Sequence, residues 1–296
     1  MKMPVGETLE GAFSFAFRNF LSVIGTMWFP YLLAGAIIGG VVYLLHPDVN
    51  AMFAAIPVDN KDPMAVFRVY QKYGHIITLA WVVLLIAGAM VRVGLMRKAL
   101  GLHPGLVFIY FSLGAPVWRM IGASLLLSII MVAIVLADIA GCALVIGLAG
   151  HALQQPVLWI ADAIAVVIAI VIPVYAAFRF FFFLTPVIVA EERIGIGRAW
   201  SLGGGNVLRI IVVLLAILLA VAIVFGILES FFLPHFVMTG TTVDPQDVQR
   251  WQAKAITSPA FVVLLLLQVV VTEALMAGAM ATGYRAVTGT AEGSAS

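Results

Sequence analysis

The sequence predicts an all-α fold, a polytopic membrane helical bundle of about six transmembrane helices with additional interfacial amphipathic helices. Of its residues, 64% are hydrophobic and only 10% are charged, and the mean hydropathy is +1.15. Soluble domains average about 45–50% apolar and about 25% charged residues. The apolar residues also gather in runs of about 20 or more, the length that one helix needs to cross a bilayer. Residues 1–296 are therefore expected to form a single integral membrane domain.

Long apolar runs with few charges define the predicted crossings in chain order. They lie near residues 20–45, 75–97, 120–150, 157–183, 207–233 and 258–285. The third run is longer than a straight crossing requires, which predicts a tilt or an extension beyond the bilayer. Pro173 is expected to kink the fourth crossing, because proline removes a helical hydrogen bond.

Shorter segments between the crossings predict helices along the membrane surface. On one side, Glu7 to Phe20, Gly105 to Trp118 and Ile196 to Leu208 each precede a crossing, as an interfacial helix or a re-entrant elbow would. On the other side, the loops near 46–74 and 234–257 contain apolar residues at helical spacing. These two loops are expected to contain short amphipathic helices, or else to be ordinary connections.

A weak likeness between three segments predicts a threefold tandem two-helix repeat. The sequences AFRNFLSVIG (16–25), PVWRMIGASL (116–125) and NVLRIIVVLL (206–215) each place an arginine just before an apolar run. Each unit would contain an inner interfacial helix, a crossing, an outer turn and a returning crossing. Chance similarity between apolar sequences is the alternative.

The distribution of Lys and Arg predicts that both termini lie in the cytoplasm, because cytoplasmic segments carry an excess of these residues. With six crossings and the amino terminus inside, the inner side receives eleven of the sixteen: Lys2, Arg18, Arg92, Arg97, Lys98, Arg119, Arg179, Arg193, Arg198, Arg209 and Arg285. The first apolar run follows two glutamates and lacks a nearby small-residue cleavage pattern. It is therefore expected to be a retained helix and not a removed signal peptide.

Carboxylates at membrane depth are the first candidate functional residues. Asp138 and Glu273 lie deep within predicted crossings, whereas Asp162 and Glu229 lie nearer to the ends. A charged side chain at the centre of a crossing costs about 2.5–3.5 kcal/mol, so it needs a partner, a proton or water. Asp138 and Glu273 are therefore either part of a proton or cation relay or hydrogen-bonded carboxyls that fix helix packing.

Charged residues near the inner ends of the crossings are the second group of candidates. Arg92 and Arg179 lie where long side chains can reach the lipid headgroups. Alternatively, they pair with Glu191, Glu192 or a lipid phosphate, which arginine binds through two parallel hydrogen bonds. An opening between helices lined by Arg92, Arg179 or Arg209 would indicate lipid handling.

No motif in the sequence indicates a reaction. Metalloprotease, nucleophile-elbow and P-loop patterns are absent, and the single cysteine, Cys142, excludes paired-cysteine metal sites. No catalytic, cofactor-binding or metal-ligating residue is assigned, and no cofactor is expected. A net charge of +2 without a run of Lys or Arg gives no basis for a nucleic-acid partner. The expected partners are the lipid bilayer, phospholipid headgroups or another membrane protein.

The segment TPVIVAEERIGIGRAWSLGGGNVLRI (185–210) resembles a stretch of uncharacterised bacterial multi-pass membrane families, notably the membrane domain associated with glycerophosphoryl diester phosphodiesterases. The matching positions are Pro186, Glu191 or Glu192, Ala199, Trp200, Ser201, Leu202, Gly205 and Arg209. The opening ETLEGAFSFAFRNF (7–20) is similar to the start of such proteins. This chain lacks a soluble phosphodiesterase domain, so the resemblance implies a bacterial inner-membrane protein without that enzymatic activity.

Together these observations favour a non-enzymatic bacterial inner-membrane protein that scaffolds a partner or handles lipids. A small transporter or channel that uses Asp138 and Glu273 is the alternative. An enzyme acting on lipid is the least favoured, because no set of nucleophile and base or of metal ligands is visible. A transporter requires its buried acids to converge on a cavity, whereas a lipid handler requires a lateral opening beside an arginine.

Overall fold

The structure is a computed structural model that describes residues 2–45, 64–103, 105–152, 155–232 and 258–289. These residues form eight helices, and the described part of the chain contains no strand. In chain order the helices are α1 (Val5–Arg18), α2 (Phe20–Leu45), α4 (Ala65–Ala99), α5 (Ala115–Ala152), α6 (Gln155–Ala190), α7 (Ile196–Gly203), α8 (Val207–Phe232) and α10 (Pro259–Thr288). The predicted all-α class is confirmed.

Six of these helices are long and apolar enough to cross a membrane, namely α2, α4, α5, α6, α8 and α10. Each corresponds to one predicted crossing, and the largest difference is at α4, which begins at Ala65 instead of near residue 75. At about 1.5 Å per residue, the 26 residues of α2 extend about 39 Å, more than the hydrocarbon core of about 30 Å. The chain is therefore a multi-pass integral membrane protein.

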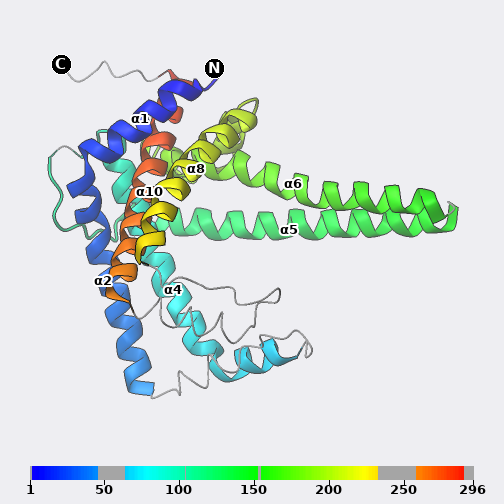
Figure 1. Cartoon of the computed structure of the whole chain (residues 1–296), viewed down its shortest axis with the longest axis horizontal. Helices are drawn as coiled ribbons and strands as arrows, with labels where there is room; N and C mark the ends of the chain where they lie inside the picture. Colours follow the sequence, from blue (N-terminus) through cyan, green and yellow to red (C-terminus); the bar gives the residue numbers. More distant parts are fainter. Residues whose placement is uncertain (1, 46–63, 104, 153–154, 233–257, 290–296) are drawn as a thin grey trace.

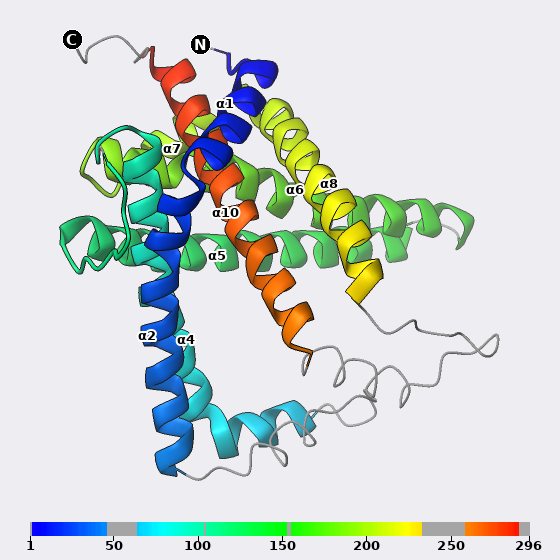
Figure 2. The same ribbon diagram turned by 60° about the vertical axis from the view of Figure 1, so that its left-hand side comes forward.

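The helices form a bundle, referred to below as the group, and a long two-helix hairpin that projects from it. Figure 1 shows α2, α4, α8 and α10 in the group, with α1 at the end where the last turns of α10 also lie. Helices α5 and α6 run side by side as a hairpin that leaves the group at a wide angle, and Figure 2 shows the same projection from another side. The hairpin thus presents much of its surface away from the other helices.

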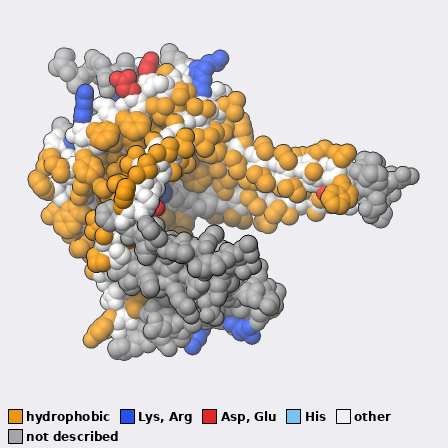
Figure 3. Space-filling model, viewed as in Figure 1, with side chains coloured by type: hydrophobic (Ala, Val, Ile, Leu, Met, Phe, Trp, Pro, Cys, Tyr) orange, Lys and Arg blue, Asp and Glu red, His pale blue; other side chains and the backbone are white. Residues whose placement is uncertain are grey.

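The core lies where the last turns of α4, α6 and α10 meet. Phe182, Phe183 and Leu184 of α6 are at most 1% exposed. They belong to one buried cluster that also includes residues of α4 and α10, and this cluster anchors the hairpin to the group. Elsewhere apolar side chains cover the visible surface of the hairpin and much of the group, and Lys and Arg gather toward the ends of the group (Figure 3). Such a surface suits lipid as the surrounding solvent.

Helix α1 crosses α10 closely because small residues meet at the crossing. Ala12 is fully buried, and an added Cβ at Gly278 would lie 2.9 Å from the Cα of Ala12. Small residues allow such close backbone approach between helices in membranes. The helix predicted between Glu7 and Phe20 is therefore confirmed, and it packs against the last crossing.

The segment before α5 is an elbow and not a helix. Residues 105–114 contain no helix and lie along α2. The backbone N–H of Val107 donates to the hydroxyl oxygen of Ser22 at 3.4 Å. The indole N–H of Trp28 donates to the carbonyl oxygen of Phe108 at 2.6 Å. Of the two alternatives for this segment, the elbow is the one observed, and its Phe111 packs edge-on against Phe29 of α2, with ring centroids 6.0 Å apart.

The three proposed repeat units are therefore not equivalent. α1 precedes α2 and α7 precedes α8, as predicted for the first and third units, but α5 is preceded by the elbow. In the predicted loop 46–74, residues 65–74 are the first turns of α4 and not a separate helix, and residues 46–63 lie outside the described residues. Figure 1 shows these turns at an angle to the rest of α4. The second predicted outer segment, 234–257, lies outside the described residues.

Candidate functional site

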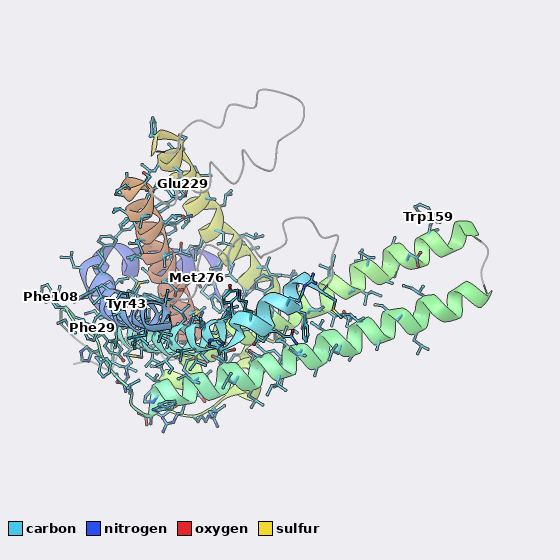
Figure 4. The ribbon with its side chains drawn as sticks, turned by 90° about the horizontal axis from the view of Figure 1, so that it is seen from below. Phe29, Tyr43, Phe108, Trp159, Glu229 and Met276 are labelled. Atoms are coloured by element: carbon cyan, nitrogen blue, oxygen red, sulfur yellow. The ribbon has the colours of Figure 1, made fainter. Side chains whose placement is uncertain are left out.

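A cavity of about 250 Å³ lies between α4, α5, α6 and α10, and we name it the central cavity. Most of its wall is apolar, and it includes four methionines: Met96, Met120, Met276 and Met280. Its charged residues are Arg92 of α4 and Glu273 of α10, and Ser124 and Thr185 add hydroxyl groups. Figure 4 shows Met276 among the helices near the middle of the group. The cavity brings together two charges that belong to different crossings.

Arg92 and Glu273 line the central cavity without pairing with each other. Among the described residues, neither has a hydrogen bond or an ion pair. The side chain of Arg92 is exposed and that of Glu273 is half-buried, so the cavity opens at Arg92. Tyr31 of α2 interacts electrostatically with both charges, which places its hydroxyl near them. Both charged groups are therefore available to a bound molecule.

Glu273 also borders a second cavity, of about 450 Å³, between α8 and α10. Gln268 and Thr272 add polar groups to its wall. The hydroxyl of Thr272 donates to the backbone carbonyl of Gln268 at 2.7 Å, so this hydroxyl is held by its own helix. Glu273 thus lines both the central cavity and this second cavity.

Asp138 lies elsewhere, in a groove of about 630 Å³ between α5 and α6. This groove shares no lining residue with the central cavity. Of the other two predicted carboxylates, Asp162 is exposed on α6 and Glu229 lies near the end of α8, as Figure 4 shows. The structure does not bring Asp138 and Glu273 together, so this arrangement does not support a relay that joins them directly.

Arg179 fastens α6 to α7. Its Nε donates to the carbonyl oxygen of Trp200 at 3.0 Å, and its Nη1 donates to the hydroxyl of Tyr175 at 3.0 Å. The guanidinium carbon also lies 3.8 Å from the centre of the Trp200 ring, a cation–π contact. Gly203 permits this approach, because an added Cβ there would collide with the carbonyl of Arg179. Arg179 is therefore bound by protein groups, and neither of its two predicted acidic partners contacts it.

Glu191, just after the end of α6, is the centre of a charge network. Its Oε2 accepts a hydrogen bond from Arg193 at 3.0 Å, and its Oε1 accepts one from Arg198 and one from Tyr284, each at 3.2 Å. Burial of the carboxyl raises its pKa, but the three hydrogen bonds outweigh this effect and hold the pKa of Glu191 below its ordinary value. The network ties the segment after α6 to α7 and α10.

The other predicted inner-side residues also contact protein groups. Arg209 donates from Nη1 to the carbonyl oxygen of Met3 at 3.2 Å. Asn206 accepts the backbone N–H of Met3 at 2.9 Å through its Oδ1, so α8 holds the start of the chain. Glu192 is exposed and lies 3.8 Å from Arg119 in a surface ion pair. Of these arginines, Arg92 lines the central cavity.

Sequence reasoning did not identify Tyr31, Ser124 or Thr185 as neighbours of the two charges. A partial signal was present in α10, because Glu273, Met276 and Met280 recur at a spacing that places them on one helix face. That spacing does not reveal which helix the face meets. The sequence does not show that this face of α10 packs beside α4, α5 and α6.

In the described ranges, no three His, Cys, Asp or Glu side chains are placed to share a metal ion. Comparison of the chain with protein-family models, curated proteins and solved structures finds no match. The resemblance to the phosphodiesterase-associated membrane domain therefore stays a prediction. The feature of this chain that bears on function is the open, charged central cavity.

Proposed function

We propose that this chain is a non-enzymatic membrane protein that binds lipid headgroups in the central cavity. The observation that carries the proposal is the pair of opposite charges, Arg92 and Glu273, in an apolar cavity without partners among the described residues. A guanidinium donates parallel hydrogen bonds to phosphate, and a carboxylate accepts hydrogen bonds from an ammonium group. The pair is complementary to a zwitterionic headgroup such as phosphoethanolamine.

The size and place of the cavity support a headgroup as the ligand. A volume of about 250 Å³ is below the range of about 300–1,000 Å³ that is usual for sites of drug-sized molecules. Arg92 lies seven residues before Ala99, the last residue of α4, which is about 10 Å along the helix. A headgroup bound there would lie inside the group of helices, while its acyl chains leave through the opening at Arg92.

Binding of labelled lipids to the purified protein in detergent tests this function. Arg92→Gln is expected to weaken binding of both phosphatidylethanolamine and phosphatidylglycerol by about tenfold or more, because hydrogen bonds to charged groups contribute about 1.5–3 kcal/mol. Glu273→Gln is expected to weaken binding of phosphatidylethanolamine alone, since phosphatidylglycerol carries no ammonium group. Arg97→Gln, on the same helix but outside the cavity wall, is the matched control. Unchanged affinities in both cavity variants would contradict the proposal.

A small transporter is the second candidate, favoured by the position of Glu273 on the walls of two cavities. Its test is proton or cation flux into liposomes that contain wild-type or Glu273→Gln protein. Flux that the wild type supports and the variant abolishes would favour transport. Absence of flux in the wild type would remove this candidate and leave lipid binding unaffected.

We further propose a bacterial inner membrane as the location, with both termini in the cytoplasm. The excess of Lys and Arg on the side of the termini supports this orientation. In a Cys142→Ser background, Gly6→Cys is expected to react with a membrane-impermeant maleimide only after the cells are permeabilised. Met64→Cys, at the outer start of α4, is expected to react in intact cells. The opposite labelling pattern would contradict the orientation.

A further inference from the structure

The central cavity and the cavity between α8 and α10 follow one another along a single face of α10. Seven residues of this helix line the two cavities, and we name them the α10 stripe: Gln268, Val269, Thr272, Glu273, Met276, Ala277 and Met280. Successive members are alternately one and three residues apart, which places them on one side of a helix with about 3.6 residues per turn. Glu273 belongs to both walls, so the two cavities adjoin at this residue.

The α10 stripe extends over more than half of the apolar layer of a bilayer. From Gln268 to Met280 the helix rises by about 18 Å, at about 1.5 Å per residue. The stripe begins nine residues after Pro259 and ends eight residues before Thr288, so it is centred on α10. A hydrocarbon core of about 30 Å leaves about 6 Å beyond each end of the stripe. The two cavities therefore cover the middle of the membrane, where a lipid headgroup is least stable.

Polar side chains are present along the whole stripe. Arg92 and Glu273 lie in the central cavity, and Gln268 lies in the second one. Among the described residues, the side-chain amide of Gln268 has no hydrogen-bond partner. An amide both donates and accepts, so it can bind a phosphate oxygen or an ammonium group. A headgroup that moves along the stripe exchanges one polar partner for the next and avoids hydrocarbon, in which an unpaired charge is costly.

Both cavities are open at the surface of the helices. In the wall of the second cavity, Leu218 of α8 is 53% exposed and Val269 is 47% exposed. Arg92, at the opening of the central cavity, is exposed as well. These residues lie within crossings, so the openings face lipid, and the acyl chains of a bound phospholipid can stay in the bilayer. The methionines of the central cavity are flexible, which lets its wall adapt to a headgroup that passes.

We propose that the two cavities form one path along which a phospholipid headgroup crosses the bilayer while its acyl chains remain in lipid. The protein would thus exchange phospholipids between the two leaflets, in both directions and without an energy source. This inference rests on the proposed binding of headgroups in the central cavity. Binding alone requires neither Gln268 nor the second cavity, so these two features distinguish transfer from binding.

Transfer of a labelled lipid in vesicles is the first experiment. Wild-type protein is placed in phosphatidylcholine vesicles with a trace of phosphatidylethanolamine that carries a fluorescent label on one acyl chain. Dithionite does not cross the bilayer, so without protein it bleaches only the outer leaflet. With the protein it is expected to bleach nearly all of the label, while a dye trapped inside the vesicles stays intact. Bleaching limited to the outer leaflet, or bleaching of the trapped dye, would overturn the proposal and leave headgroup binding in detergent unaffected.

Removal of the amide of Gln268 tests the path itself. Gln268→Leu is expected to slow transfer about tenfold or more, the factor for one hydrogen bond to a charged group. Its affinity for phosphatidylethanolamine in detergent is expected to stay unchanged, because Gln268 does not line the central cavity. A transfer rate equal to that of the wild type would overturn the proposal. A loss of affinity as large as the loss of rate would also overturn it, because the second cavity would then be part of the binding site.

A second variant narrows the path without removing a polar group. Ala222 of α8 lines the second cavity, and Ala222→Phe is expected to slow transfer about as much as Gln268→Leu. Val224→Phe is the matched control, because Val224 is on the same helix, is 54% exposed and lines neither cavity. Thermal unfolding in detergent shows that each variant is folded. Equal transfer rates in the two phenylalanine variants would contradict a path through the second cavity.

Discussion

Replacement of Arg179 is expected to release α7 from α6. The hydrogen bond from Nε to the half-buried carbonyl of Trp200 is assigned about 1.5 kcal/mol, at the low end for a charged donor. The cation–π contact with the Trp200 ring adds about 0.5–1 kcal/mol, whereas the bond to the hydroxyl of Tyr175 lies within α6 and does not oppose opening of α7. Arg179→Gln should therefore lower the local opening free energy of α7 by about 2–2.5 kcal/mol.

Amide hydrogen exchange measured on peptides that cover Ile196–Gly203 reports this change directly. A loss of about 2–2.5 kcal/mol raises the exchange rate of these amides about 30- to 70-fold if they exchange through local opening. Arg179→Lys keeps the charge but loses the directed donors of the guanidinium, so it should restore only part of the protection. Arg97→Gln is the control, because Arg97 lies in the last turn of α4 and outside the contacts between α6 and α7.

The result for lysine decides between two roles of Arg179. If Arg179→Lys exchanges like the wild type, a positive charge alone is sufficient, as expected for a side chain that reaches toward lipid headgroups. If both variants exchange like the wild type, this result refutes a role of the guanidinium in holding α7 against α6.

Three further predictions concern helix packing, the Glu191 network and the contact between Asn206 and Met3. Gly278→Val should lower the free energy of unfolding by about 1–3 kcal/mol, because the added Cβ would press against α1. The control is Gly39→Ala, whose added Cβ meets no atom within 4 Å and should not destabilise the protein. Thermal unfolding in detergent compares the two variants. Glu191→Gln should remove stability that the wild type has above the ordinary glutamate pKa of about 4.3. Because the pKa of Glu191 is lowered in the folded state, the stability advantage of the wild type should fade as the pH falls through this lowered value. A stability advantage that persists in stronger acid would count against this prediction. Asn206→Ala should free the amino terminus at a cost of about 1–3 kcal/mol, since it removes the acceptor of the Met3 N–H, and unchanged protease resistance of α1 would contradict this.

The crossings could be predicted because helix formation in lipid is a local property. A run of about 20 apolar residues must satisfy its own backbone hydrogen bonds, and this is possible without any neighbour. The predicted ends of α2 and α8 therefore agree with the structure within a residue. The start of α4 was missed because its first turns contain charged residues that hydropathy assigns to a loop.

The candidate site was harder to predict because lipid is as apolar as a helix interface. In a soluble helix the polar stripe marks the outside, but the helices here are apolar on every side, so the pattern does not show which face packs. Arg179 illustrates the consequence: its sequence position suits a headgroup ligand, yet α7 folds back and binds it. The elbow at 105–114 is a similar case, since its hydrogen bonds are to a distant helix, α2.

The sequence by itself determined that this is an all-helical, multi-pass membrane protein and which residues carry charge into the apolar spans. Only the tertiary structure decided which of those charges share a space. Glu273 meets Arg92 in the central cavity, whereas Asp138 is left in the groove of the hairpin. The physical reason is that the free-energy cost of a charge in lipid follows from the residue type and its place in the apolar run, both of which the sequence gives. The group that offsets this cost depends on which helix faces pack together, and only the tertiary structure gives that packing.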